Sequence, residues 1–185
     1  MGRGTLYLAS GSPRRRMLLE LCGFQVEVVA PTLEEIWPGG HPKQAVIDLA
    51  CQKLASSRDR RGCYLAADTI VCCDESVLGK PKDSFDAVGM LRLLAGRTHS
   101  VWTGVAVSDG LGPIQTTAVC SFVTFRKLEE YELAAYVETG ESLDKAGAYG
   151  IQGVGGCLVK TVEGSYSNVI GLPVEESLRL IDSLI

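Results

Sequence analysis

The sequence predicts a mixed α/β domain, and three observations support this expectation. In the first half, apolar runs of strand length alternate with segments whose apolar residues recur at helical spacing. In the second half, two long strand-like segments, 100–108 and 114–125, flank the turn DGLGP and predict a hairpin. No repeat or linker interrupts the chain. We therefore expect a mixed sheet flanked by helices, in one domain over residues 1–185 whose shape is two-lobed.

The N-terminal elements follow in order. Residues 5–10 predict a first strand, which leads at once into a helix over 13–22. Ser12 can cap this helix, and Pro13 suits its first position because the N–H that proline lacks would have no partner there. Residues 24–30 alternate between apolar and polar side chains, so a second strand is expected.

Longer elements fill the middle and the end of the chain. Helical spacing of apolar residues is clear over 42–57 and 83–94. The near-continuous apolar run over 64–73 is typical of a central strand that is buried on both faces. Besides the hairpin, the remaining predicted elements are a helix over 128–138, a strand over 158–162 and a helix over 174–185 that follows the break at Pro173.

Charge and hydropathy exclude two classes of partner. The formal net charge is -4 and the sequence pI is about 5.2, which disfavours broad attraction to nucleic acid or to an acidic membrane surface. No apolar stretch approaches the roughly 20 residues of a membrane-spanning helix. Binding of an anion should therefore depend on a local group of positive side chains.

The cysteines are expected to be reduced thiols. There are seven, none in a Cys-x-x-Cys pair, and most lie in apolar runs such as TIVCC. This usage is typical of buried thiols in a cytoplasmic protein. A zinc site is not expected, because His41 and His99 are the only histidines and neither stands at ligand spacing from a cysteine.

The segment SGSPRRR, residues 10–16, is the first candidate for binding. A tight turn from a strand into a helix presents unpaired backbone N–H groups, and such helix starts attract phosphate. Arginines in the first turn oppose the helix dipole, so a bound phosphate would relieve the repulsion and gain bidentate hydrogen bonds. The alternative is an ordinary solvated surface.

Asp68 is the second candidate, because it lies inside the apolar strand LAADTIV. A carboxylate there costs several kcal/mol unless it is paired, hydrogen-bonded or bound to a metal. These residues therefore favour a metal ligand or a general base at Asp68. The alternative is a structural aspartate that closes a turn.

Two further segments are polar or glycine-rich without an obvious structural reason. LGKPKD holds Lys80 on a turn, but Pro81 follows the lysine and the phosphate-binding-loop pattern fails. DKAGAYGIQGVGG, residues 144–156, contains five glycines, which imply close packing of the backbone or approach of a ligand. It contains no dinucleotide-binding pattern. Gln152 within it offers an amide donor and a carbonyl acceptor.

Nucleophilic hydrolase chemistry is not supported. The sequence contains no Gly-x-Ser-x-Gly elbow, and His99 has no evident nucleophile as a partner. A histidine in this setting is expected to be a structural hydrogen-bonding group.

Taken together and in this order, eight segments resemble the Maf family. They are SGSPRRR, TLEE at 32–35, LACQKL with Lys53, LAADTIV, LGKP, LAGRTHSVWTGVAV, GESLDKAGAYGIQG and GSYSNVIGLP. The resemblance extends from about Leu6 to the last helix and so covers essentially the whole chain.

The resemblance implies a housecleaning nucleoside triphosphate pyrophosphatase with an inosine triphosphatase-like fold and a deep cleft between its lobes. It further implies a divalent metal, Mg²⁺ or Mn²⁺, a homodimer and a cytoplasmic location. Arg14, Thr69 and Gln152 match the positions associated with substrate choice in the branch that acts on dTTP and UTP. We expect these two nucleotides, or modified pyrimidine nucleotides, as substrates.

The resemblance also implies the roles of the site residues. Water would attack the α-phosphorus, with Asp68 polarising it and with Glu35 and Asp68 as metal ligands. Lys53 and Lys80 would add positive charge, and the substrate contacts would be Ser10, Ser12, Arg14, Arg15, Thr69 and Gln152. Glu34 is the alternative to Glu35, because the family's acidic pair usually reads Asp-Glu.

Two further hypotheses concern how the base is recognised and whether the protein is an enzyme. The Gln152 amide can complement one donor and one acceptor on the edge of uracil or thymine. A different class of function is a nucleotide-binding regulator of septum formation with little catalysis. Retention of both candidate carboxylates and both lysines favours the enzyme, because binding alone needs no group that activates water.

Overall fold

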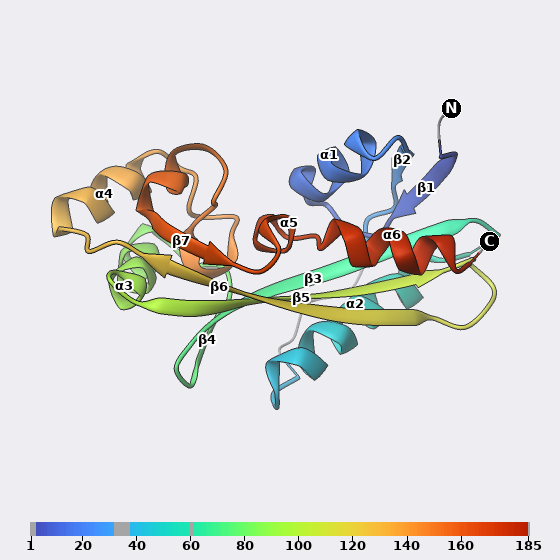
Figure 1. Ribbon diagram of the computed structural model, residues 1–185, viewed down its shortest axis with the longest axis horizontal. Helices are drawn as coiled ribbons and strands as arrows, with labels where there is room; N and C mark the ends of the chain where they lie inside the picture. Colours follow the sequence, from blue (N-terminus) through green and yellow to red (C-terminus); the bar gives the residue numbers. More distant parts are fainter. Residues whose placement is uncertain (1–2, 32–37, 60, 185) are drawn as a thin grey trace. The chain divides into compact units, whose positions relative to one another are not determined.

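Strand β3 (Cys63–Cys73), the near-continuous apolar run, lies inside the sheet, as the sequence predicts. The computed structural model describes residues 3–31, 38–59 and 61–184. The described residues form a seven-stranded sheet with the order β2-β1-β3-β5-β6-β7, and β4 pairs with β3 (Figure 1). The other strands are β1 (Thr5–Leu8), β2 (Gln25–Val28), β4 (Ser76–Leu78), β5 (Thr98–Ser108), β6 (Gln115–Phe125) and β7 (Val159–Glu163).

The sheet is mixed, which confirms the predicted class. Strand β1 pairs in parallel with both β2 and β3, whereas β3 with β4 and β6 with β7 are antiparallel. The register of β1 on β3 places Leu6 opposite Cys63 and Leu8 opposite Leu65. Both faces of β3 are buried, since nine of its eleven residues are, and this explains why its sequence is apolar without alternation.

The five predicted helices are present to within a few residues, and α5 (Tyr166–Ile170) is an additional one. The five are α1 (Pro13–Leu21), α2 (Pro42–Ser57), α3 (Ser84–Leu94), α4 (Glu130–Glu138) and α6 (Val174–Asp182), with 3₁₀ turns η1 (Ala146–Ala148) and η2 (Gly153–Leu158). Local side chains set several starts: the Asp83 carboxylate accepts from the Asp86 N–H at 2.8 Å, and Glu129 and Glu132 form a capping box. None of the helices in the described ranges is long and apolar enough to cross a membrane.

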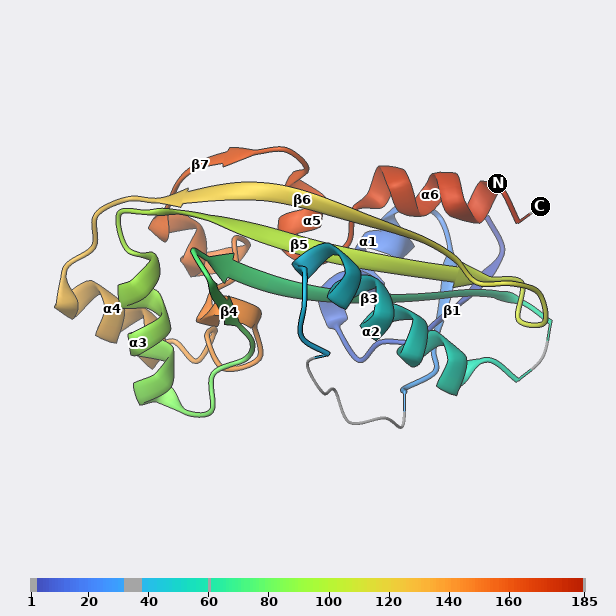
Figure 2. The same cartoon turned by 90° about the horizontal axis from the view of Figure 1, so that it is seen from below.

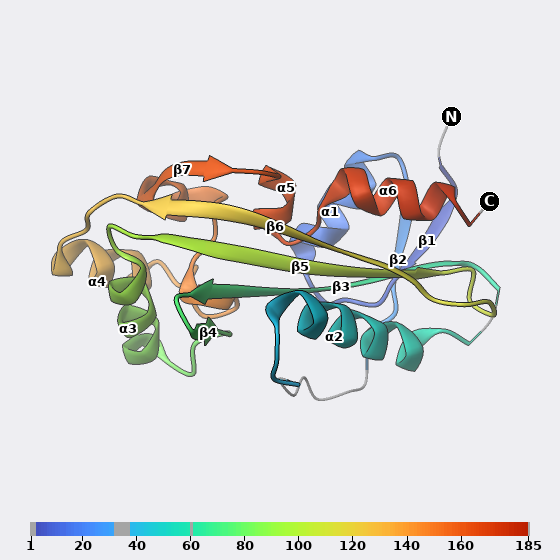
Figure 3. The same ribbon diagram turned by 60° about the horizontal axis from the view of Figure 1, so that its bottom comes forward.

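The contacts divide the chain into two compact units, residues 1–68, 103–119 and 171–185 in the first and 69–102 and 120–170 in the second. In the first unit, α1 and α6 pack on one sheet face through Leu19 and Ile181. Helix α2 packs on the opposite face through Ala50 and Leu54 (Figures 1 and 3). The first unit is therefore a three-layer α/β/α arrangement.

The second unit has its own apolar core. Helices α3 and α4 pack against each other and contribute Leu91 and Leu133 to it, beside Val71 and Phe125 from the strands (Figure 2). Strands β3, β5 and β6 each contribute residues to both units. We propose on this ground that residues 1–185 form one folding domain.

Three features differ from the sequence-based expectations. Strand β4, the two 3₁₀ turns and α5 are additional short elements. Ser12 occupies the N-cap position of α1, but its side chain makes no capping hydrogen bond, so that expectation was wrong. All seven cysteines are free thiols, yet only Cys72 and Cys73 are buried, four are partly buried and Cys157 is exposed.

Candidate functional site

The three arginines of the turn between β1 and α1 have different environments. Arg15 points inward and is 9% exposed; its Nε donates to the Gly171 carbonyl at 2.8 Å, and its Nη1 donates to Ser10 Oγ at 2.9 Å. Ser10 Oγ also accepts from the Ser12 N–H at 3.3 Å. Arg16 is exposed and pairs with Glu20, one helical turn away, and Arg14 is half-buried.

These contacts make Ser10 and Arg15 part of the framework of the turn. A buried guanidinium bonded to a carbonyl of the loop before α6 fixes the start of α1, because the charge would be costly to leave without hydrogen bonds. The turn that the sequence predicts as a phosphate site is thus held in one conformation from inside. Arg16, which the sequence analysis did not place in the site, is accounted for by its pair with Glu20.

Lys53 and Asp68 form a buried ion pair. Lys53 Nζ donates to Asp68 Oδ1, and both side chains are 8% exposed. Lys53 lies on α2 and Asp68 in the middle of β3, so two predicted site residues that are 15 positions apart meet in the first unit. The pair explains how an aspartate is tolerated inside an apolar strand.

A close approach of α2 to the sheet sets the position of Lys53. Gly104 of β5 faces the backbone of α2, and a Cβ atom there would lie 2.3 Å from the Val46 carbonyl oxygen and 2.7 Å from the Ile47 nitrogen. Only a glycine permits this contact, since real Cβ atoms are not found so near other atoms. The contact with Gly104 therefore sets the distance between α2 and the sheet at Val46, two helical turns before Lys53.

The predicted site residues Thr69, Lys80 and Gln152 belong to the second unit. Lys80 is exposed on the loop after β4, and Gln152 is half-buried. Backbone bonding joins their two loops, because the Gly147 N–H donates to the Gly79 carbonyl at 3.0 Å. Gly147 has φ +68, and a Cβ atom there would lie 3.0 Å from the Val71 side chain, so this contact also requires glycine.

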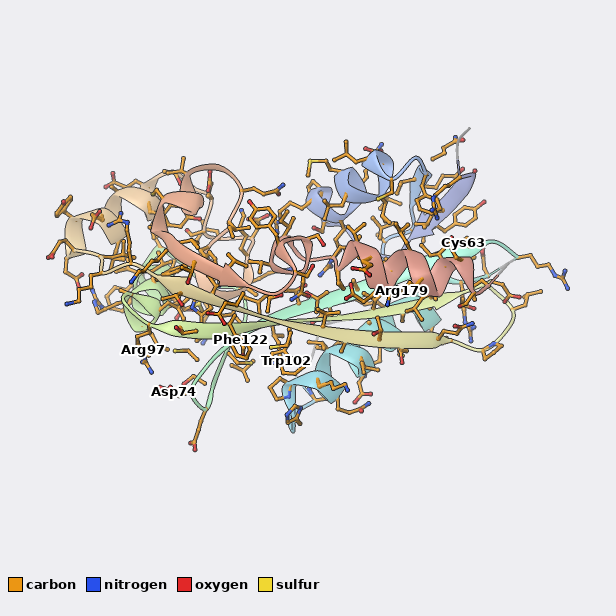
Figure 4. The ribbon with its side chains drawn as sticks, in the orientation of Figure 1. Cys63, Asp74, Arg97, Trp102, Phe122 and Arg179 are labelled. Carbon is orange, nitrogen blue, oxygen red and sulfur yellow. The ribbon has the colours of Figure 1, made fainter. Side chains whose placement is uncertain are left out.

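An ion pair fixes the hairpin that leads to Lys80. Asp74, in the tight turn between β3 and β4, has φ 51, a left-handed conformation that aspartate tolerates better than most residues. Its carboxylate accepts from Arg97 Nη2 (Figure 4). Because both side chains are substantially exposed, the pair contributes little to stability and mainly orients the turn.

The predicted metal site is described only in part. Glu34 and Glu35 lie outside the described residues. Within the described ranges no group of three or more His, Cys, Asp or Glu side chains could hold a metal ion. Asp68 supplies one hard carboxylate donor, which is the ligand type that Mg²⁺ and Mn²⁺ prefer. The chemistry of this donor fits such an ion, with Lys53 beside it.

A cavity of about 470 Å³ in the first unit is not the candidate site. It is lined by Phe24, Cys63, Asp109 and Ile181 among others, and none of the predicted site residues in the described ranges lines it. Burial raises the pKa of the Cys63 thiol to about 11, so at neutral pH this cysteine is protonated and is a poor nucleophile.

His99 has the structural role that the sequence predicts. It is 2% exposed, and its Nε2 lies 2.8 Å from Tyr149 Oη. The Phe125 ring packs edge-on against the imidazole, with 5.0 Å between the two ring centroids. Burial lowers the pKa of His99 to about 4 and raises the pKa of Tyr149 well above its usual range. His99 is therefore a neutral hydrogen-bonding group that holds Tyr149 at neutral pH.

This burial predicts a loss of stability in acid. The unfolded chain binds a proton at His99 below its usual pKa of 6.5, whereas the folded chain does so only near 4, so stability falls as the pH drops from 6.5 to 4. The shift corresponds to about 3 kcal/mol. We expect urea unfolding from pH 7 to pH 4 to show this loss for the wild type relative to His99→Gln. If the free energy of unfolding changed with pH by the same amount in both proteins, this prediction would be contradicted.

Comparisons with known proteins found a family model and relatives that match nearly the whole chain. A family model described as "Maf-like protein" matches residues 5–184. A Desulfitobacterium hafniense protein named dTTP/UTP pyrophosphatase is 49% identical over 92% of this chain and 81% of that protein. A Salmonella typhimurium protein of the same name is 47% identical over 96% of this chain and 91% of that protein.

One solved structure supports the fold. The Staphylococcus aureus Ham1 protein is similar with a TM-score of 0.54 and 10% identity, covering 97% of this chain and 96% of that one. At this identity the likeness concerns the fold alone, and it agrees with the predicted mixed α/β architecture.

Proposed function

Because this chain belongs to the Maf family, we propose that it is a nucleoside triphosphate pyrophosphatase that converts dTTP and UTP to the monophosphate and pyrophosphate. The two relatives described above carry the name dTTP/UTP pyrophosphatase and align with nearly all of this chain. The observation that carries the proposal is the buried ion pair of Lys53 and Asp68 on α2 and β3. A buried carboxylate held by a lysine can orient a water molecule, which hydrolysis needs and nucleotide binding alone does not.

The proposed reaction is attack of water on the α-phosphorus. Asp68 accepts a hydrogen bond from the attacking water and orients it, while the hydrogen bond from Lys53 holds the carboxylate in place. The bond between the α-phosphorus and the bridging oxygen breaks, and pyrophosphate leaves. Phosphoryl transfer of this kind depends on charge neutralisation and orientation more than on covalent chemistry.

Positive groups and backbone N–H groups would hold the polyphosphate. We assign phosphate contacts to Arg14, Arg15, Ser10 and Ser12 at the start of α1, where N–H donors and guanidinium groups suit phosphate oxygens. Lys80 adds a further positive charge. A divalent cation, Mg²⁺ or Mn²⁺, held by Glu35 and Asp68 would supply neutralisation of the phosphate charge.

The remaining proposals concern base choice and assembly. Thr69 and Gln152 are assigned to base and substrate recognition, with the Gln152 amide complementary to the edge of uracil or thymine. We further propose a homodimer in the cytoplasm.

Pyrophosphate release over a panel of nucleotides, with Mg²⁺ or Mn²⁺ present, tests the proposed activity. We expect turnover of dTTP and UTP, and a loss of about a thousandfold or more in kcat for Asp68→Asn, because the amide neither attracts the water proton nor binds a cation well. If only modified nucleotides were hydrolysed, the proposed substrates dTTP and UTP would be replaced by those nucleotides. Absence of release from every nucleotide would contradict the enzyme and favour the nucleotide-binding regulator.

A further inference from the structure

Glu141 holds the glycine-rich loop that carries Gln152. Its Oε1 accepts from the Val154 N–H at 3.0 Å, and its Oε2 accepts from the Gly155 N–H at 3.1 Å. These two donors lie in the first turn of η2, where backbone N–H groups have no partner within the turn. The hydrogen bond from Val154 is the main reason that the pKa of Glu141 is lowered, so the carboxylate is charged at neutral pH.

The glycines of this run permit the close contact. A Cβ atom at Gly153 would lie 2.5 Å from Glu141 Oε1. A Cβ atom at Gly155 would lie 2.2 Å from the Gly150 carbonyl oxygen and 2.7 Å from Tyr136 Oη. The run is therefore a packed structure built around a carboxylate and a tyrosine, and the glycines are explained by this contact rather than by flexibility.

The chain is also fixed on the other side of Gln152. The Gly150 N–H donates to Tyr136 Oη at 3.1 Å, and Tyr149 is buried against His99. Gln152 itself is half-buried at the N-cap of η2, and its side chain makes no capping hydrogen bond. The backbone is therefore held on both sides of Gln152, and the side-chain amide of Gln152 does not cap η2.

We propose that Glu141 is a positioning residue for base recognition, acting through the loop that presents Gln152. This inference rests on the proposed function. The edges of uracil and cytosine differ in where they carry a donor and an acceptor, and a loop that can shift would let the Gln152 amide meet either edge. Because two charge-assisted hydrogen bonds hold the backbone of this loop, the Gln152 amide can meet only one of the two base edges.

The test measures the ratio of kcat/KM for UTP to that for CTP. We expect Glu141→Ala to lower this ratio about tenfold, since misplacing a recognition group costs discrimination. Glu141→Gln keeps one acceptor and should lower it less. Gln152→Ala should lower the ratio at least as far, and adding Glu141→Ala to Gln152→Ala should lower it no further. Glu138→Ala, at the exposed end of α4, is the matched control and should leave the ratio unchanged.

The outcomes separate the inference from the proposed function. Wild-type protein that releases no pyrophosphate from UTP would contradict both. If the wild type prefers UTP but Glu141→Ala keeps the preference, the inference alone is overturned. An equal loss toward UTP and CTP, repeated in the Gln152→Ala background, would show a structural role only. A preference that survives Gln152→Ala would remove the residue through which Glu141 is proposed to act.

Discussion

Lys53→Met is expected to destabilise the protein by about 3–5 kcal/mol, the usual cost of breaking a buried pair by removing one partner. Lys53 and Asp68 are each 8% exposed, so methionine would fill the space of the lysine stem but leave the Asp68 charge buried without its counterion. Most of the cost is the desolvation of that carboxylate. Urea unfolding of the two proteins at neutral pH measures the difference, and pyrophosphate release should be lost as well.

The double variant Lys53→Met, Asp68→Asn distinguishes charge from packing. It removes both charges, so it should be more stable than Lys53→Met alone while remaining inactive. If Lys53→Met changes the free energy of unfolding by less than about 1 kcal/mol, the pair behaves as a solvated surface pair. Additive losses in the double variant would show that the lysine stem matters through packing rather than through its charge.

The periodicity of the sequence was sufficient to predict most of the fold. Strand β3 and helix α2 have unambiguous patterns, because a central strand is apolar throughout and a helix that packs on a sheet has one apolar face. Strand β4 was missed, since three residues after a tight turn are too few to show a period. Helix α5 was missed for the same reason, with five residues between a serine-rich turn and a glycine.

The sequence indicated candidate residues for the site but not the contacts that these residues make. Asp68 was conspicuous because a carboxylate in an apolar strand needs a partner, yet nothing in the spacing identified Lys53 as that partner. The arginine run looked uniform, whereas the fold turns Arg15 inward to the Gly171 carbonyl, 156 positions away. No charge pattern distinguished Glu141 from other surface carboxylates; its place shortly before a glycine-rich run is the signal that could have indicated its role.

Gly104→Ala is the second change for which we expect a large effect, a loss of about 3 kcal/mol in the free energy of unfolding. The added methyl group would overlap the α2 backbone, 2.4 Å from the Val46 carbonyl carbon. Backbone cannot rotate away as a side chain can, so α2 must move off β5. That movement would draw Lys53 away from Asp68, and kcat/KM should fall on the order of a hundredfold. Urea unfolding and pyrophosphate release measure the two effects.

Gly89→Ala is the matched control for this prediction. Gly89 is exposed within α3, and a Cβ atom there would meet nothing within 4 Å. The same chemical change should therefore stabilise the protein by up to about 1 kcal/mol, because alanine favours a helix more than glycine does, and activity should be unchanged. Since the two substitutions are identical, opposite signs of their effects would trace the loss at Gly104 to contact with α2. Equal effects at both positions would contradict that origin.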